Sequence, residues 1–437
     1  MAQADVAVVG AGLAGMTAAI SLAQAGARVQ VLASGHAATH WSAGGVDAGA
    51  LAGARTSRAA VEQLAGQAGH PYAFVADELA GGLAWLRTAL AVDGLTLVGE
   101  LDDPLRPIPT SIGSTRRAAI VPDGAAGALP AWRADETLFV CGPAGFKDYW
   151  PEAIAAGLRR AEVWRGEPGP GRIEALSVEL PGLRTRRNLS GLDLARQFDQ
   201  PAWRSEALEA IAAAVAERQR RLAGSSSSAR IALPAVLGLA DHPAALAEAR
   251  TRLPAIPFEV ALVPPSVPGL RLFEALRATL RRHGGRLIVG EAAHGSIGPG
   301  GHLTEIRSPA AARELVVSAG AFILATGGIA GGGIWAAGPG SLRETVLGLP
   351  VDVPAERPWL ANDPFDPAGH PLELAGIRTD AQLRPIAPGA GPGGSPLADN
   401  VRIAGSLLAG QRYLRERCGD GVALASGRRA AAGSWPG

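Results

Sequence analysis

The residues that most directly indicate chemistry are three glycines near the start of the chain. Gly10, Gly12 and Gly15 form the pattern G-x-G-x-x-G between a short apolar run and an alanine-rich segment with helical spacing. Glycine permits the tight turn and leaves room for a pyrophosphate, while the helix N-terminus offers its amides to phosphate. This placement predicts a nucleotide-binding site that includes Leu13 and Ala14. A glycine-rich turn without a ligand is the alternative.

A second candidate segment reads His-Trp-Ser-Ala-Gly-Gly-Val-Asp over residues 40–47. Its Ser-Ala-Gly-Gly stretch resembles the flavin-contacting loop of fumarate reductase and succinate dehydrogenase flavoproteins. Those enzymes attach flavin to a histidine six residues before the first glycine, a register that holds Ala38 here, so the resemblance implies a noncovalent flavin. His40 is a candidate base near the ring or, alternatively, a hydrogen-bonded packing residue. The flavin contacts predicted from this segment are Ser42, Ala43, Gly44 and Gly45.

The second strand of the nucleotide-binding unit ends without the residue that usually holds ribose. Dinucleotide-binding proteins place Asp or Glu at that position, whereas this chain reads Val-Leu-Ala-Ser over residues 31–34. Ser34 offers a single hydrogen bond there, so the adenosine half of FAD would be held less firmly. The sequence therefore favours FMN, with FAD as the alternative.

Three later segments resemble further elements of many flavoproteins with two dinucleotide-binding-type motifs. Ala-Thr-Gly-Gly over 325–328 ends a buried strand, as the Ala-Thr-Gly element does, and residues 376–380 resemble the element that follows. Residues 400–410 resemble the strand and turn that close over flavin, and the resemblance directs the N-terminus of the final helix at N1 and O2 of the ring. The contacts predicted from these segments are Thr326, Gly327, Gly405, Ser406, Gly419, Gly421 and Val422.

Two arginines beside these elements are candidate contacts for an anionic substrate. A phosphorylated or carboxylated substrate needs a fixed cation, and Arg271 and Arg378 both lie next to proposed flavin-domain segments. The alternative for each is an ordinary solvated arginine. The run of Arg184, Arg186 and Arg187 is interpreted as an exposed face.

A parallel sheet is needed to position these residues. The strand–helix–strand pattern over 5–32 has the size of one βαβ crossover, and the runs 320–326 and 401–404 predict strands that end at the later motifs. The pattern predicts an α/β, Rossmann-type flavoprotein of the FAD/NAD(P)-binding fold with an inserted second domain. The predicted domains are a flavin-binding domain of residues 1–50 plus 266–437 and an inserted substrate, cap or partner-binding domain of residues 51–265.

Composition excludes several classes of partner and site. With 41 basic and 40 acidic residues, the net charge of +1 provides no global field for nucleic acid. Two cysteines cannot supply the ligands of an iron–sulfur cluster, so any such cluster belongs to a partner. No metal site is predicted, and without a signal peptide or a membrane-spanning apolar stretch we expect a cytoplasmic chain.

At the level of family, the chain resembles the B subunit of anaerobic glycerol-3-phosphate dehydrogenase along nearly its full length. The proline–serine segment at 264–267 is the most specific match, and residues 417–421 depart from the family by having fewer glycines. The other matching segments are the opening glycine motif and residues 40–47, 70–72, 233–234, 238–241, 269–272, 347–349, 405–406 and 418–419.

The resemblance implies a flavin subunit, usually with FMN, that joins a catalytic A subunit and a membrane-attached iron–sulfur C subunit. Such a complex oxidises glycerol 3-phosphate to dihydroxyacetone phosphate and passes electrons to quinone for fumarate or nitrate respiration. His40 is then the candidate base, and the arginines fix the phosphate. Three alternatives remain: an electron relay whose partner oxidises the substrate, a non-catalytic assembly subunit, and a free-standing reductase of the fumarate type.

Overall fold

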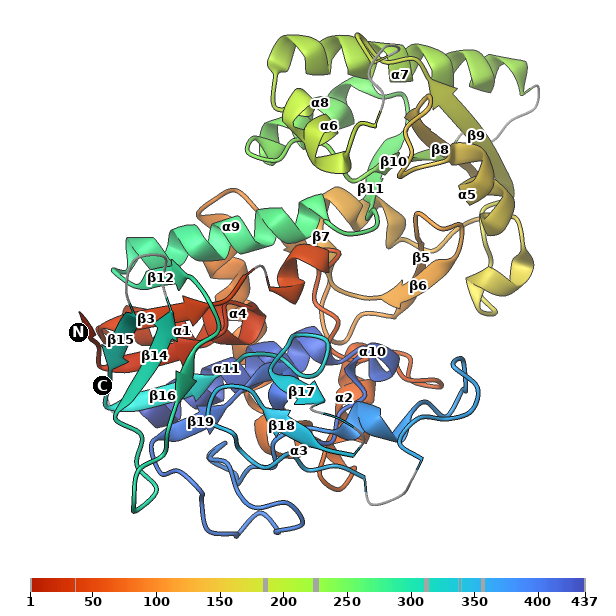
Figure 1. Ribbon diagram of the computed structural model, residues 1–437. Coiled ribbons are helices and arrows are strands. Elements are labelled where there is room, and N and C mark those ends of the chain that lie inside the picture. The colour runs from red at the N-terminus through yellow and green to blue at the C-terminus, as the bar shows by residue number, and fades with distance from the viewer. Residues whose placement is uncertain are drawn as a thin grey trace. The chain divides into compact units, whose positions relative to one another are not determined.

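The structure is a computed structural model in which the chain forms two compact units (Figure 1). The first unit comprises Met1–Thr39, Val46–Ala89 and Glu274–Gly437, and the second comprises His40–Gly45 and Leu90–Phe273. The residues described are 2–35, 37–183, 188–222, 228–309, 314–336, 338, 340–354 and 358–435, so the arginine run at 184–187 lies outside them. Within these residues, no helix has the length and apolar character needed to cross a bilayer.

The core of the first unit is a five-stranded parallel sheet (Figure 1). In spatial order its strands are β12 (Arg286–Val289), β3 (Val29–Ala33), β2 (Val6–Val9), β16 (Ala321–Leu324) and β19 (Val401–Ile403). Numbered along the chain this order is 3-2-1-4-5, which is the Rossmann order. β2 and β16 are buried along their whole length and pair where the order reverses. Open α/β sheets bind ligands at the carboxyl ends of strands at this point.

Two helices rich in small residues pack together beside this sheet. They are α1 (Leu13–Gln24), which follows β2, and α11 (Gly419–Ser434), which ends the chain. A side chain at Gly427 would come within 2.5 Å of the carbonyl oxygen of Ala14, so the two helices approach each other closely only with glycine there. The predicted α/β Rossmann-type fold is confirmed by this sheet and its flanking helices.

The rest of the first unit surrounds this core. A four-stranded sheet has the order β1-β15-β14-β13, in which only β1 and β15 pair in parallel. Its strands and the other elements are β1 (Ala2–Gln3), α2 (Ser57–Ala65), α3 (Tyr72–Val75), β13 (His294–Gly295), β14 (Glu305–Pro309), β15 (Glu314–Ser318), β17 (Ile334–Ala336), β18 (Leu342–Glu344), η4 (Pro371–Leu374), η5 (Gly405–Leu407) and α10 (Tyr413–Glu416). Three elements have residues in both units: η1 (Ala38–Trp41), α4 (Glu78–Ala91) and α9 (Val267–Arg282).

The second unit is built on a parallel sheet of its own. Its spatial order is β11 (Ile256–Val260), β10 (Ala229–Pro234), β8 (Thr137–Pro143) and β9 (Arg172–Val178), and every neighbouring pair is parallel. Read from β9, this order is 2-1-3-4 along the chain, the start of the flavodoxin-like order. Its helices are α5 (Pro151–Leu158), α6 (Gly191–Phe198), α7 (Pro201–Arg221), α8 (His242–Arg252), η2 (Asp123–Ala128) and η3 (Ala161–Trp164), and its two short ladders pair β4 (Leu97–Val98) with β7 (Val121–Pro122) and β5 (Arg106–Pro109) with β6 (Thr115–Ala118).

The limits of the two units differ from the predicted domain boundaries at residues 51 and 265. Residues 51–89 belong to the first unit because α4 packs on its helices: Trp85 donates to Gln24 at 2.8 Å, and a side chain at Gly82 would lie 2.9 Å from Leu424. Residues 40–45 belong to the second unit instead. Both assignments depend on contacts between distant segments, which local sequence patterns do not report.

Candidate functional site

The three glycines of the first motif lie between the carboxyl end of β2 and α1, and they serve different purposes. Gly10 has φ +110°, and a side chain there would overlap the carbonyl oxygen of Ala325. A side chain at Gly15 would overlap the carbonyl oxygen of Gly10. A methyl group at Gly12 would meet only the Cβ of Ala37, at 3.7 Å, so this position faces open space. Packing explains Gly10 and Gly15, whereas Gly12 leaves room for a ligand.

The N-terminus of α1 offers its amides without an acceptor of its own. Gly12 is the N-cap and supplies no side-chain hydrogen bond, and the first turn contains no acidic residue. Among the described residues, no acceptor is found for the amides of Leu13 and Ala14. A helix start of this kind binds phosphate oxygens, so the cradle suits the pyrophosphate of a dinucleotide. Ser34 lies exposed at the tip of β3, as the sequence suggested.

The later motifs converge on the carboxyl ends of β16 and β19 in the same unit. The amide of Gly328 donates to Ser406 Oγ at 3.1 Å, and the amide of Gly405 donates to Ser426 Oγ of α11 at 2.9 Å. Gly405 has φ +72°, and a side chain there would lie 2.9 Å from the Cβ of Ala14. The structure therefore brings the segment after β19 onto α1, beside the first glycine motif.

Thr326 and Gly327 follow β16 at the same edge of the sheet. The hydroxyl oxygen of Thr326 is buried and has no hydrogen-bond partner among the described residues. A buried hydroxyl without a partner is costly unless a ligand or water satisfies it. This atom therefore fits a polar cofactor group placed between β2 and β16.

The start of α11 is tied to the segment that follows the predicted flavin loop. The amide of Gly421 donates to the carbonyl of Asp47 at 3.1 Å, and the amide of Asp47 donates to Asp420 at 3.1 Å. The amide of Val422 bonds back to Cys418 within the first turn. Among the described residues, the amide of Gly419 has no acceptor. One amide of this helix start is therefore free to meet a ligand.

The predicted flavin loop and His40 belong to the second unit. The carbonyl of His40 accepts from the amide of Ser266 at 2.8 Å, and its ring packs edge-on against Phe273 with centroids 4.4 Å apart. A side chain at Gly44 would lie 2.8 Å from Pro268, and one at Gly45 would lie 2.5 Å from the carbonyl oxygen of Ile120. The loop, with Ser42 and Ala43, is therefore held by the segment 266–273 and by the backbone at Ile120. Its place relative to the glycine motifs of the first unit stays a prediction.

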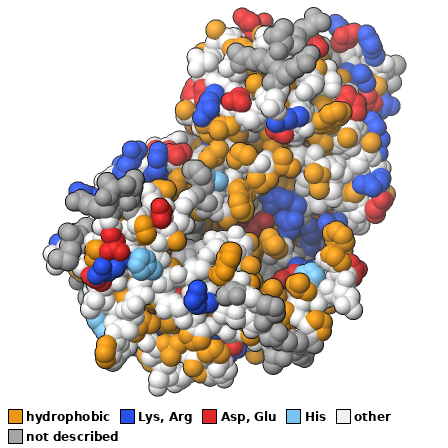
Figure 2. All heavy atoms as spheres, viewed as in Figure 1, with side chains coloured by type: hydrophobic (Ala, Val, Ile, Leu, Met, Phe, Trp, Pro, Cys, Tyr) orange, Lys and Arg blue, Asp and Glu red, His pale blue; other side chains and the backbone are white. Residues whose placement is uncertain are grey.

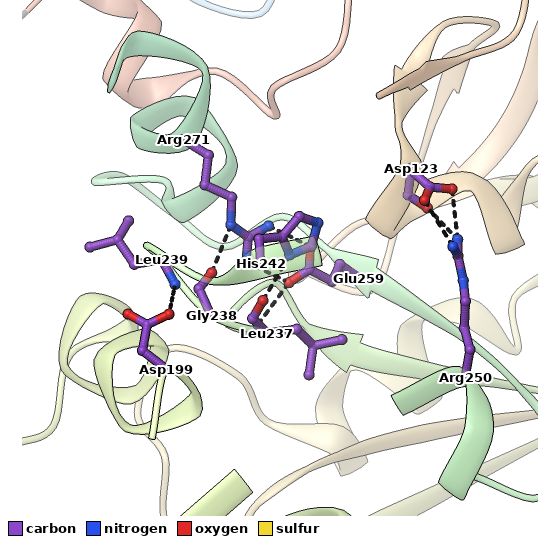
Figure 3. Close-up of polar contacts among 9 residues, drawn as sticks. All are labelled: Asp123, Asp199, Leu237, Gly238, Leu239, His242, Arg250, Glu259 and Arg271. Atoms are coloured by element: carbon purple, nitrogen blue, oxygen red, sulfur yellow. Dashed lines mark hydrogen bonds and ion pairs between the residues drawn. The ribbon is translucent and has the colours of Figure 1, made fainter. Parts of the chain in front are cut away.

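Arg271, predicted as a substrate contact, instead uses its guanidinium inside the second unit. It is 5% exposed, bonds Glu259 at 2.7 and 3.0 Å, and donates to the carbonyl of Gly238 at 2.8 Å (Figure 3). Burial opposes the charge of Glu259, but the nearby charges of Arg271 and His242 hold the pKa of this carboxyl below its usual value. His242 donates from Nδ1 to the carbonyl of Leu237, and burial lowers the pKa of its ring.

Arg378 is also paired, although it is less enclosed. Its guanidinium bonds Asp352 at 2.6 and 2.9 Å, and 36% of its side chain is exposed. The structure thus places the two predicted arginines in different units, each with a carboxylate of its own. Neither presents an uncompensated positive charge, which was the property that made them candidates.

Two groups of functional interest were missed by sequence reasoning. Asp199 accepts hydrogen bonds from the amides of Leu239, Ala240 and Asp241, and its carboxylate points toward Leu239 (Figure 3). His70 and Cys418 were noted only as matches to a family, yet they meet Glu416 in a buried cluster. No sequence signal identifies these partners, since Asp199 lies 40 positions from Leu239 and His70 lies 346 positions from Glu416.

Comparisons with known proteins agree with this geometry. Residues 5–422 match the model of the FAD binding domain family. The B subunit of anaerobic glycerol-3-phosphate dehydrogenase from Yersinia enterocolitica is 30% identical over 440 residues, covering 97% of this chain and 96% of that protein. This chain therefore belongs to the FAD-binding domain family, and within it to the B subunits of anaerobic glycerol-3-phosphate dehydrogenase.

Other B subunits of this dehydrogenase match over similar lengths. The Vibrio vulnificus protein is 27% identical and covers 98% of this chain and 95% of that protein. The probable B subunit of Halobacterium salinarum is 28% identical and covers 97% of this chain and 96% of that protein. Among solved structures, iminodiacetate oxidase from Chelativorans sp. BNC1 is 15% identical with a TM-score of 0.34, and it covers 98% of this chain and 94% of that one.

The family match corrects the predicted cofactor. It identifies a flavoprotein dehydrogenase whose cofactor domain is of the FAD-binding type, and the preference for FMN is not supported. That preference depended on the missing carboxylate at Ser34, but the absence of one ribose contact does not remove the pyrophosphate cradle at Gly12. A pyrophosphate is present in FAD and absent from FMN, so the open cradle agrees with FAD.

Proposed function

We propose that this chain is the FAD-binding subunit of a quinone-linked anaerobic glycerol-3-phosphate dehydrogenase. The observation that carries the proposal is the match to a B subunit of that enzyme over 97% of the chain, at 30% identity. The first unit supports it, because its cradle at Gly12, Leu13 and Ala14 and the buried hydroxyl of Thr326 suit a noncovalent dinucleotide. Oxidation of glycerol 3-phosphate to dihydroxyacetone phosphate would deliver electrons to quinone for fumarate or nitrate respiration.

In this proposal FAD, when bound, supplies the two-electron acceptor, and the chain supplies binding and proton transfer. The substrate loses the C2 hydrogen as hydride and its hydroxyl proton to a base, which yields the ketone. His40 is the proposed base, and Arg378 the proposed phosphate contact, because its side chain is partly exposed. Arg271 would act indirectly, by holding the segment that supports the loop at Gly44 and Gly45.

A second candidate is an electron relay, in which the A subunit oxidises the substrate. The observation that favours it is the pairing of both predicted arginines with carboxylates, Arg271 with Glu259 and Arg378 with Asp352. A phosphate dianion would have to compete with a carboxylate at either position. The electrons would continue to an iron–sulfur subunit, since this chain has two cysteines, both buried and free.

We also propose that the chain is cytoplasmic and reaches the inner membrane through its A and C partners. Large apolar side chains are exposed in the first unit at Phe365 and Leu414 and in the second at Trp150 and Ile112. Hydrophobic side chains are visible over both units on the face drawn in Figure 2. Partner subunits are the proposed occupants of the surfaces that carry these side chains.

The decisive experiment is the visible spectrum of the purified chain, followed by acid release and chromatography of the chromophore. Released FAD is expected, whereas a colourless protein would favour the non-catalytic assembly subunit.

Addition of glycerol 3-phosphate under anaerobic conditions then separates direct oxidation from the electron relay. Bleaching in the isolated chain supports direct oxidation, and bleaching only after co-purification with the A subunit supports the relay. Return of the flavin colour when fumarate is added to a reduced sample, without a response to glycerol 3-phosphate, would favour a reductase of the fumarate type.

His40 is tested in the same assay. Replacement by glutamine, His40→Gln, should leave the flavin content unchanged and abolish bleaching by glycerol 3-phosphate if the residue is the base. Full bleaching in this variant would remove His40 from that role.

A further inference from the structure

Two buried side chains and one backbone amide of the first unit converge on one carboxylate oxygen. Glu416 Oε2 lies 3.3 Å from His70 Nε2 and 3.5 Å from Cys418 Sγ, and it accepts the amide of Arg412 at 2.7 Å. His70 is 1% exposed and Cys418 is fully buried. We call His70, Glu416 and Cys418 the α10–α11 cluster, because Glu416 ends α10 and Cys418 caps α11.

The charge states within the cluster agree with three donors around one anion. Burial opposes ionisation of Glu416, but the hydrogen bond from His70 holds its pKa below the usual value. Burial, together with the neighbouring Glu416, raises the pKa of the Cys418 thiol well above its usual value. Glu416 is therefore an anion and Cys418 a neutral donor, so the carboxylate is stabilised by hydrogen bonds from the protein in place of hydration.

The tautomer of His70 shows that the cluster is a hydrogen-bond network. The ligand atoms of the three side chains lie within 4.8 Å of one another, a spacing that could suit a metal ion. However, the amide of Tyr72 donates to His70 Nδ1 at 3.1 Å, so the proton of the neutral ring is on Nε2, which faces Glu416. A metal-binding histidine has the reverse arrangement, with a lone pair on the metal and a proton on the other nitrogen.

The cluster encloses a strained turn. Arg417 lies between Glu416 and Cys418 and has φ 49° and ψ 46°, a left-handed conformation that non-glycine residues rarely adopt. Such strain persists only where the surroundings determine the backbone, and here both neighbours of Arg417 are fixed in the cluster. The turn leads directly into α11, where the amide of Gly419 has no acceptor among the described residues.

We propose that His70, Glu416 and Cys418 are positioning residues for the flavin, which hold the turn at Arg417 so that the amide of Gly419, at the start of α11, faces the bound cofactor. The inference rests on the proposed function, since it requires a flavin at the carboxyl edge of the first sheet. A helix N-terminus stabilises negative charge, and a reduced flavin carries more negative charge than an oxidised one. The cluster should therefore raise the midpoint potential of the bound FAD.

The experiment is a potentiometric titration of the holoprotein with and without His70→Phe. Phenylalanine keeps the bulk of the ring but removes the hydrogen bonds to Glu416 and Tyr72. We expect at least a tenfold loss of preference for reduced over oxidised FAD, a fall of about 30 mV for a two-electron couple, with a shifted visible spectrum. The matched control is Tyr149→Phe, which loses a buried hydrogen bond to Ala232 in the second unit and should keep the wild-type potential.

Two variants of Cys418 make the test independent of the stability of His70→Phe. Cys418→Ala removes the donor to Glu416 and should lower the potential, whereas Cys418→Ser restores a donor and should return it to the wild-type value. Equal potentials in wild type, Cys418→Ala and Cys418→Ser would overturn the proposal. A wild-type chain without any flavin would instead refute the proposed function, so the two failures are distinguishable.

Discussion

The two units contain parallel sheets of related architecture that differ at their carboxyl edges. In the first, the helix after β2 begins at Gly12 without a side-chain cap, and no carboxylate among the described residues occupies its amides. In the second, the carboxylate of Asp199 accepts hydrogen bonds from the amides that lead into α8, and Glu259 near the end of β11 forms an ion pair with Arg271. We call the carboxyl edge at Gly12 the open edge, because it is left free for an anionic ligand. We call the carboxyl edge at Asp199 and Glu259 the closed edge, because the chain's own carboxylates occupy it. Topology predicts where a ligand could bind, and the local charges decide whether one can.

The largest expected effect tests the open edge, with Gly12→Ala compared with Gly10→Ala. A methyl group at Gly12 meets only Ala37 at 3.7 Å, whereas one at Gly10 overlaps the carbonyl oxygen of Ala325. Gly12→Ala should therefore keep the fold and weaken FAD binding at least tenfold, about 1.4 kcal/mol. Gly10→Ala should lose both the fold and FAD binding. Flavin fluorescence titration and thermal unfolding separate the two effects, and unchanged FAD affinity in Gly12→Ala would show that the pyrophosphate lies elsewhere.

The next effect tests the closed edge by removing one partner of its buried ion pair. Arg271→Met leaves Glu259 buried without its counter-ion, and such changes cost about 3–5 kcal/mol. Denaturant unfolding of the second unit should report this loss. The double variant Arg271→Met with Glu259→Leu should recover part of it, because no unpaired charge remains. Equal stabilities of the single and double variants would contradict the claim that Glu259 is a charged partner of Arg271 at the closed edge.

The contrast between the two edges also shows what the sequence could and could not predict. The Rossmann-type sheet, the strand before Gly10 and the later motifs were predictable because glycine turns and buried runs are local patterns. The start of α11 followed from the same reasoning, whereas the contacts of Gly405 with Ser426 and Ala14 did not. The pairing of Arg271 with Glu259, and of Asp199 with the start of α8, joins residues that only the folded chain brings together. Arg271 was predicted as a substrate contact without knowledge of Glu259, since charge is visible in a sequence but its partner is not.

A smaller effect is expected from opening the closed edge at Asp199. Asp199→Ala leaves the amides of residues 239–241 without their acceptor and should cost about 1–3 kcal/mol. If the edge is an anion site filled by its own carboxylate, inorganic phosphate should then stabilise Asp199→Ala more than wild type in thermal unfolding. The matched control is Asp193→Ala, which removes the same charge from the cap of α6. An equal response to phosphate in all three proteins would show that the amides do not form such a site.

The smallest effect is the pH dependence that Glu259 confers on the second unit. Its pKa is lower in the folded chain than the ordinary value of 4.5, so the folded state binds fewer protons there than the unfolded chain does. Its contribution to stability is thus complete above pH 4.5 and is lost as the pH falls through the lowered folded pKa. Denaturant midpoints measured for the second unit between about pH 7 and about pH 3 should fall more steeply in wild type than in the double variant Arg271→Met with Glu259→Leu, in which this titration is absent. Parallel pH profiles in the two proteins would mean that the pKa of Glu259 is the same in the folded and unfolded chain, and the contrast with the open edge would then be one of packing rather than of charge.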